Sequence, residues 1–297
     1  MMAAQLLSFR GKLLHDEPLS RHTSWRVGGP ADTYYQPADL DDLAVFLQSL
    51  PQSEPVYWLG LGSNLLVRDK GIRGAVIAVS GTLNDLSTIG DTAVRAEVGV
   101  PSAKVAKFSS QQGLRGAEFL CGIPGTIGGA LAMNAGAFGG ETWDIVSSVE
   151  TIDKTGKLRQ RTHEEFTIAY RSVKGLGEEW FVAAHFGLSK GDPVEGKEKI
   201  STLLAKRGDT QPTQMPNAGS VFKNPPDDYS ARLIESCGLK DCCIGQACVS
   251  SMHANFIVNK GGASAKDIES LIYKVQATVF EQQGVRLEPE VRIVGEE

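Results

Sequence analysis

The chain has 297 residues, of which 41% are hydrophobic and 22% charged, and its formal net charge is −5 at pH 7. This length predicts two domains, each large enough to bury a core of its own. The acidic balance and the lack of a long basic run exclude nucleic acid as the main partner. No segment has the eighteen apolar residues of a membrane span, and the start MMAAQLLSFRGKLLHDEP lacks a signal-peptide core, so we expect a cytoplasmic protein.

The first part of the chain alternates strands, loops and helices, as the spacing of its apolar residues indicates. Asp39 is suited to cap a helix that Pro51 ends, and Pro101 and Gly113 flank a second helix. The elements expected here are a strand and loop over 22–37, a helix over 40–50, strands over 56–59, 75–79 and 93–100, and the helix that starts near Pro101.

Beyond residue 141 the pattern changes to alternating strands joined by turns. Thr162 and Glu165 have the spacing of a capping box and predict a short helical turn. A linker is expected from Gly191 to Gly196, where the chain is polar. The other elements expected here are strands over 148–152 and 158–161 around a turn at 154–156, a strand over 181–188, and a helix from the linker to about 206.

The C-terminal part contains a long amphipathic helix. Between Ala265 and Gln283, apolar residues recur at helical spacing and predict one buried face, formed by Ile268, Leu271, Ile272, Val275 and Val279. The elements expected around it are a loop with the sequence NAGSVFKNP, a helix over 230–237, a strand over 255–258 and a last strand over 285–294. The chain is therefore expected to be α+β, with one domain at 1–200, whose core spans about 23–190, and a second at 201–297.

The segment from Gly122 to Glu141, GIPGTIGGALAMNAGAFGGE, holds seven glycines and four alanines in twenty residues. Glycines permit positive φ angles and remove the Cβ atoms that would hold a ligand away from the backbone. The run therefore predicts a close approach to a polyanionic ligand through converging N–H groups. A flexible linker is the alternative, but the apolar residues Ile127, Leu131 and Phe138 favour a segment that packs.

A second glycine loop, Gly60-Leu61-Gly62-Ser63-Asn64, directly follows the expected strand VYWL. A Rossmann fingerprint would need a third glycine at Leu65, and no Walker A lysine pattern occurs, so neither fold is expected. Alone, this loop is as consistent with a tight turn as with a ligand site. Together, the two glycine segments indicate a ligand with two linked phosphates, held by backbone amides from both sides.

Seven motifs, collinear from about residue 20 to the end, carry a resemblance to a known family. They are VGGPA at 27–31, GLGSNLLV at 60–67, the segment 122–141, YRSV at 170–173, AGSVFKNP at 218–225, SSMHANFIVN at 250–259 and LEPEVRIVG at 287–295. This set resembles the UDP-N-acetylenolpyruvoylglucosamine reductase family, flavoproteins that complete UDP-N-acetylmuramate in peptidoglycan synthesis. The chain is similar to the shorter form of the family, because the run from Lys223 to Tyr229 leaves no room for an extra tyrosine loop.

The resemblance implies a two-subdomain FAD-binding fold of the vanillyl-alcohol oxidase type, followed by a smaller α/β substrate domain. The glycine loops would hold the FAD pyrophosphate, and neither contains a histidine, so we expect FAD to be noncovalent. The cofactor-binding residues that it implies are Gly60, Leu61, Gly62, Ser63, Asn64, Leu65, Gly122, Ile123, Pro124, Gly125, Thr126, Gly128, Gly129, Asn134, Ala135 and Gly136.

The family's reaction passes a hydride from NADPH to flavin and then to the enolpyruvyl methylene carbon of the sugar nucleotide, so an enolate must be stabilised and protonated. By motif, Ser220 corresponds to the proton donor, Arg171 to the arginine that binds the substrate carboxylate, and Glu290 to the glutamate that assists protonation. Without the resemblance, Ser220 would be read as a turn residue and Arg171 as a surface arginine. Glu288, on the same side of the expected strand, stays an alternative to Glu290.

Tyr170, Lys223 and Asn224 are expected to bind substrate. Arg207 and the pair Gln211–Pro212 match an element that leads into the family's substrate domain. The expected partners are UDP-N-acetylglucosamine enolpyruvate and NADPH, and the protein is expected to act as a monomer without a metal ion.

Four of the five cysteines, Cys237, Cys242, Cys243 and Cys248, lie where the family would show small residues. The spacing of these four contains no C-x-x-C pair of the zinc kind, and the odd total of five cysteines does not resemble a secreted disulfide framework. We therefore expect reduced thiols that act as small hydrophobic side chains or surface groups, with sensitivity to oxidation as the alternative.

Two other functions stay open. One is a flavin oxidase or dehydrogenase of the same superfamily that acts on another substrate. The motifs around Ser220 and Glu290 argue against it, because other members of that superfamily carry different substrate domains. The other is a flavin- or nucleotide-binding module without turnover, for which Ser220→Ala and Glu290→Gln would change only ligand affinity.

Overall fold

The computed structural model describes residues 9–297. Residues 1–8, which begin the segment expected to lack a signal-peptide core, lie outside this range. The chain divides into two compact units. Unit 1 comprises the described residues up to 15 with 33–60 and 74–204, and unit 2 comprises 16–32, 61–73 and 205–297. The expected division into ligand-binding domains at residue 200 is a separate property and stays a prediction.

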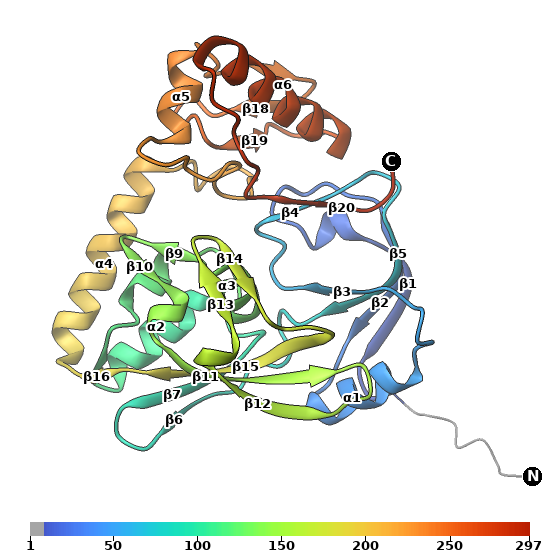
Figure 1. Cartoon of the computed structure of the whole chain (residues 1–297), viewed down its shortest axis with the longest axis vertical. Coiled ribbons are helices and arrows are strands. Elements are labelled where there is room, and N and C mark those ends of the chain that lie inside the picture. The colour runs from blue at the N-terminus through green and yellow to red at the C-terminus, as the bar shows by residue number, and fades with distance from the viewer. Residues whose placement is uncertain (1–8) are drawn as a thin grey trace, which may run out of the picture. The chain divides into compact units, whose positions relative to one another are not determined.

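The largest sheet of unit 1 has five antiparallel strands in the order β12-β11-β15-β7-β6 (Figure 1). These are β12 (Leu158–Thr162), β11 (Val146–Asp153), β15 (Glu179–Gly187), β7 (Ala93–Glu97) and β6 (Leu86–Ile89). A four-stranded sheet has the order β1-β2-β5-β3, formed by β1 (Lys12–Pro18), β2 (Pro30–Gln36), β5 (Ile72–Ala78) and β3 (Val56–Leu59). The chain crosses between the units within β1, β2 and β5.

Short elements complete unit 1 and carry its glycine segment. The helices are α1 (Leu40–Ser49), α2 (Ser102–Gln111) and α3 (Ile127–Met133). The short strands are β8 (Leu114–Arg115), β9 (Gly136–Ala137), β10 (Gly140–Glu141), β13 (Thr167–Ala169), β14 (Ser172–Lys174) and β16 (Ser189–Lys190). Apolar side chains from the sheets and helices form one core, which includes the buried residues Leu43, Ile77, Leu120, Ile127 and Phe186.

Unit 2 contains two small sheets and two helices of its own. Strand β4 (Leu65–Val67) pairs in parallel with β20 (Arg292–Val294). The second sheet has the order β17-β18-β19, formed by β17 (Cys243–Ile244), β18 (Ala247–Val249) and β19 (Ile257–Asn259). The helices are α5 (Ser230–Ser236) and α6 (Ala265–Gln283), which are labelled in Figure 1. Helix α6 contacts β17 and β18. Helix α4 (Pro193–Thr210) contains the boundary between the units at 204.

Local sequence signals predicted several elements correctly. Helix α6 has the expected bounds, and all five residues of its predicted face are buried. The Asp39 side chain caps α1 by accepting a hydrogen bond from the N–H of Asp42, and Thr162 and Glu165 form the expected capping box. None of the described helices is long and apolar enough to cross a membrane.

Two expected elements differ from the structure. The expected linker at Gly191–Gly196 is wrong from Pro193 onwards, because α4 begins there. The Asp192 carboxylate accepts the N–H of Val194 at 2.7 Å. The last strand was expected from residue 285, but β20 begins only at Arg292. The residues before it pair with another segment instead, since Pro289 forms a bridge with Phe222 and the N–H of Glu290 donates to Val221.

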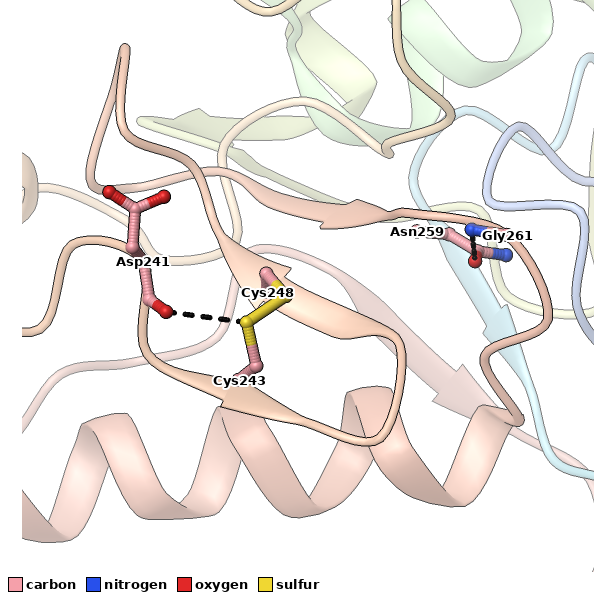
Figure 2. Close-up of a disulfide and its surroundings, with 5 residues drawn as sticks. All are labelled: Asp241, Cys243, Cys248, Asn259 and Gly261. Carbon is pink, nitrogen blue, oxygen red and sulfur yellow. Dashed lines mark hydrogen bonds between the residues drawn. A yellow bond between two sulfur atoms is a disulfide. The ribbon is translucent and has the colours of Figure 1, made fainter.

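The prediction of reduced thiols is wrong for one pair of cysteines. Cys243 and Cys248 form a disulfide across the hairpin β17–β18, with 4.1 Å between their Cα atoms (Figure 2). The two residues lie directly opposite each other, and the N–H of Val249 donates to the carbonyl of Cys242 at 2.9 Å. This is a non-hydrogen-bonded pair, in which side chains approach closest. The cysteine spacing alone did not reveal this hairpin register.

Candidate active site

The glycines of the segment Gly122–Glu141 serve mainly to let the chain pack on itself. Only Gly139 has a positive φ among the seven glycines of this fully described segment, so the other six do not use the positive φ angles that glycine permits. A Cβ at Gly140 would lie 2.8 Å from Phe119, and one at Gly136 would lie 2.6 Å from the carbonyl oxygen of Gly140. Glycine is therefore required by close contacts within unit 1.

Helix α3 was not predicted from the composition. Backbone N–H groups in its first turn donate to carbonyl groups of the protein. The N–H groups of Ile127 and Gly128 donate to the carbonyls of Val100 and Val98 at 2.9 and 3.0 Å. A Cβ at Gly128 would lie 3.0 Å from the Cβ of Val98. These two amides are therefore engaged by the protein.

Thr126 is the polar side chain of this segment that the fold leaves unsatisfied. Its Oγ1 is buried and has no hydrogen-bond partner among residues 9–297. A Cβ at Gly60 would lie 2.5 Å from this oxygen, so only glycine lets residue 60 approach it. A Cβ at Gly129 would meet no heavy atom of the described chain within 4 Å. This part of unit 1 thus has an unsatisfied hydroxyl, at Thr126, and open space beside the backbone, at Gly129.

Asn134 ends α3, and its side chain forms hydrogen bonds within the protein. It adopts the left-handed conformation at φ 42°, donates to the Glu141 carboxylate at 2.7 Å and accepts from the N–H of Trp143 at 3.1 Å. Its side chain therefore shapes the glycine segment.

Arg171 is attached to the same segment. It lies with Tyr170 at the tip of the hairpin β13–β14 and has a φ of 52°. Its guanidinium donates to the carbonyls of Asn134 and Gly136 at 3.2 and 3.1 Å and lies 5.0 Å from the centroid of the Tyr170 ring. The sequence predicted Arg171 and Tyr170 as site residues, and the structure brings Arg171 onto the glycine segment.

In unit 2, the loop that continues from Gly60 turns at Gly62, which has a φ of 61°. A Cβ there would overlap the carbonyl oxygen of His22, and the N–H of Ser24 donates to the Gly62 carbonyl at 3.2 Å. The next residue but one, Asn64, donates from its side-chain amide to the backbone carbonyl of Glu290 at 3.0 Å. The loop is therefore joined to the segment that carries the expected catalytic glutamate.

Ser220 and Glu290 lie in neighbouring segments of unit 2. The N–H of Glu290 donates to the carbonyl of Val221 at 2.8 Å, directly after Ser220. Asn255, which was only part of a quoted motif, holds this segment from the other side. Its buried amide accepts from the N–H of Phe222 at 2.9 Å and donates to the carbonyl of the same residue at 2.8 Å. No local sequence pattern indicates this role, since it depends on pairing between distant segments.

Lys223, Glu288 and Asn224 also have defined contacts. Lys223 donates to the Glu288 carboxylate at 2.5 Å, and its N–H donates to the Glu288 carbonyl at 2.9 Å. This ion pair engages the Glu288 carboxylate, and the choice between Glu288 and Glu290 stays a prediction. The Asn224 side chain accepts from the N–H of Ser230 at 3.1 Å, where α5 begins.

His253 lies close to the Asn255 support. Its Nδ1 accepts from the N–H of Asn255 at 3.3 Å, and its ring packs edge-on against Phe256. Burial lowers the pKa of His253, because the charged imidazolium loses solvation. A neutral ring is also the form that can accept at Nδ1.

Comparison with known proteins identifies the family. A model described as an FAD binding domain matches residues 31–161, and the model of the UDP-N-acetylenolpyruvoylglucosamine reductase C-terminal domain matches residues 211–294. The UDP-N-acetylenolpyruvoylglucosamine reductase of Methylococcus capsulatus is 58% identical over 97% of this chain and 94% of its own length. The chain belongs to the UDP-N-acetylenolpyruvoylglucosamine reductase family. The resemblance stated from the motifs is thereby confirmed.

Other members of the reductase family agree in sequence and fold. The reductase of Legionella pneumophila strain Corby is 52% identical over 100% of this chain and 96% of its own. A crystal structure of the Thermus caldophilus reductase is 31% identical, covers 96% of this chain and 99% of its own, and has a TM-score of 0.83. These matches confirm an FAD-binding fold followed by the reductase C-terminal domain. Ser220 and Glu290 lie within the C-terminal match, and Arg171 lies between the two matches.

Proposed function

We infer that the chain is an FAD-dependent oxidoreductase that uses NADPH to reduce the enolpyruvyl group of UDP-N-acetylglucosamine enolpyruvate. The product is UDP-N-acetylmuramate, a precursor of peptidoglycan. The observation that carries this function is the near full-length identity of 58% to a named reductase. The enzyme works in the cytoplasm, where NADPH and sugar nucleotides are found, and it works as a monomer.

FAD fits the residues that unit 1 provides. A buried hydroxyl without a partner destabilises a fold by about 1–3 kcal/mol, and Thr126 Oγ1 is such a group among the described residues. Gly60 approaches this oxygen because it has no Cβ, and a Cβ at Gly129 would meet no described heavy atom within 4 Å, so Gly129 leaves space beside the backbone. Within unit 1, the residues that would hold FAD are Gly60 and those of the segment 122–136. The chemistry that bound FAD supplies is hydride transfer, first from NADPH and then to the enolpyruvyl methylene carbon.

Arg171 binds the substrate carboxylate and stabilises the enolate that forms beside it. A planar guanidinium matches the two oxygens of a carboxylate and keeps its charge at every physiological pH. Two of its donors are bonded to the carbonyls of Asn134 and Gly136, which fixes the direction of the side chain. Preorganised charge of this kind lowers the barrier without rearrangement during the reaction.

Ser220 donates the proton to the carbon next to the carboxylate, and Glu290 assists this transfer. A serine hydroxyl is a weak acid, so the transfer requires a strongly basic carbon and a fixed geometry. The hydrogen bonds of Val221 to Asn255 and Glu290 supply a rigid backbone directly after Ser220. Tyr170, Lys223 and Asn224 bind the remainder of the substrate.

The reductase function is tested by anaerobic reoxidation. Protein reconstituted with FAD is reduced by one equivalent of NADPH, and UDP-N-acetylglucosamine enolpyruvate is then added without oxygen. The reductase regains its flavin absorbance with formation of UDP-N-acetylmuramate. Reoxidation by oxygen alone, with no effect of the sugar nucleotide, would instead identify an oxidase, and FAD binding without reduction by NADPH would identify a binding module.

A further inference from the structure

Asn64 lies in the loop assigned to the cofactor, yet its side-chain amide is bonded to the protein. Nδ2 of Asn64 donates to the backbone carbonyl of Glu290 at 3.0 Å, across 226 positions of sequence. The backbone carbonyl of Asn64 accepts from the N–H of Arg292 at 3.0 Å. Asn64 therefore bonds the chain on both sides of Val291.

The bond from Arg292 belongs to the ladder of β4 and β20, and the side-chain bond of Asn64 continues that ladder by one step. Strands β4 and β20 begin at the pair Leu65 and Arg292, and the chain before β20 contains Pro289, which cannot donate. The Asn64 side chain takes the place of one further backbone donor. A primary amide has the same N–H and C=O groups as a peptide, so it can extend a ladder in this way.

The backbone of Glu290 is thereby held from two directions. Its N–H donates to the carbonyl of Val221, in the segment of Ser220, and its carbonyl accepts from Asn64. Fixing both groups fixes the peptide planes around residue 290 and, with them, the direction in which its side chain leaves the backbone. A loss of the Asn64 bond frees one of these two restraints.

We propose that Asn64, in the loop 60–65, is a positioning residue. Its bond to the Glu290 carbonyl orients the Glu290 side chain. This inference rests on the proposed role of Glu290 in protonation. It differs from the sequence expectation, in which Asn64 contacts FAD directly. In the proposed arrangement, the side chain of Asn64 acts on the oxidative half-reaction through Glu290 and contributes little to cofactor affinity.

The variant Asn64→Asp separates these two roles. Aspartate has nearly the same size as asparagine, but its carboxylate cannot donate to the Glu290 carbonyl at pH 7. The matched control is Asn259→Asp. Asn259 Nδ2 donates to the backbone carbonyl of Trp25 at 2.9 Å, and this side chain lies in unit 2, so the same kind of bond is lost away from Glu290.

Three measurements are compared in the wild type, Asn64→Asp and Asn259→Asp. We expect Asn64→Asp to slow the anaerobic oxidative half-reaction ten- to a hundredfold and to change the FAD dissociation constant less than threefold. Amide hydrogen exchange of a peptide spanning 288–296 becomes faster, with and without FAD. Asn259→Asp leaves the half-reaction and the exchange of this peptide at wild-type values.

A double variant decides whether Asn64 acts through Glu290. If it does, Asn64→Asp combined with Glu290→Gln is no slower than Glu290→Gln alone. Effects that multiply would overturn the inference, as would weaker FAD binding with equal loss in both half-reactions. A wild-type rate in Glu290→Gln would instead refute the proposed role of Glu290. A slow Glu290→Gln beside a normal Asn64→Asp would refute only the positioning by Asn64.

Discussion

The guanidinium of Arg171 donates to the backbone carbonyl of Gly136 at 3.1 Å, which anchors the expected substrate-binding arginine to the glycine segment. A second bond, to the carbonyl of Asn134, fixes the plane of the group. In unit 2, Glu290 is joined in a comparable way to Asn64 of the other glycine loop. In both units, a residue assigned to chemistry is thus fixed by a segment assigned to the cofactor.

Replacing Arg171 by lysine keeps the charge but removes this anchoring. A lysine ammonium lacks the planar fork that reaches two carbonyls and a carboxylate together. We therefore expect Arg171→Lys to slow the oxidative half-reaction at least a hundredfold, measured by anaerobic stopped-flow absorbance. The control is Arg159→Lys, which retains the charge opposite Glu179 in unit 1 and stays within threefold of the wild type. A wild-type rate in Arg171→Lys would show that charge alone suffices.

A side chain at Gly60 is expected to weaken FAD binding. A Cβ at this position would lie 2.5 Å from Thr126 Oγ1, so either the loop or the threonine must move. We expect Gly60→Ala to raise the FAD dissociation constant at least tenfold, measured by quenching of flavin fluorescence on titration of apoprotein. Gly208→Ala, within α4, is the control, because a Cβ there meets no described heavy atom within 4 Å. Unchanged affinity in Gly60→Ala would contradict the proposed cofactor site.

The disulfide between Cys243 and Cys248 gives a prediction about thiols and stability. Two of the five cysteines are paired, so denatured but unreduced protein exposes three titratable thiols. Closing so short a loop stabilises the fold by about 2 kcal/mol. The variant Cys243→Ser, at the exposed end, loses this amount of unfolding free energy in urea, and the loss disappears when both proteins are reduced. Five reactive thiols in the unreduced sample would contradict the pairing.

The sequence predicted what depends on neighbouring residues. The helical spacing of Ile268, Leu271 and Val275 was enough to place α6, and Asp39 was enough to start α1. The motifs also supplied the family and a set of candidate residues. These signals are local, and collinear motifs carry much information even without structure.

Contacts between distant segments could not be predicted. The bonds of Asn64 to Glu290 and of Asn255 to Phe222 each require a register that no local pattern encodes. The disulfide depends in the same way on the pairing of β17 with β18. In the glycine segment, the composition suggested residues that adopt positive φ angles. Glycine is instead required at Gly136 and Gly140 because a Cβ there would clash with neighbouring atoms.

The most direct test of this account is the effect of Ser220→Ala on the two half-reactions, measured separately by anaerobic stopped-flow spectroscopy. Removing the hydroxyl removes the proposed proton donor and leaves the groups that serve NADPH oxidation in place. We predict that the oxidative half-reaction with UDP-N-acetylglucosamine enolpyruvate slows by several orders of magnitude, while reduction by NADPH stays within a few fold of the wild type. Equal losses in both half-reactions, or no loss in either, would contradict the role of Ser220 as proton donor.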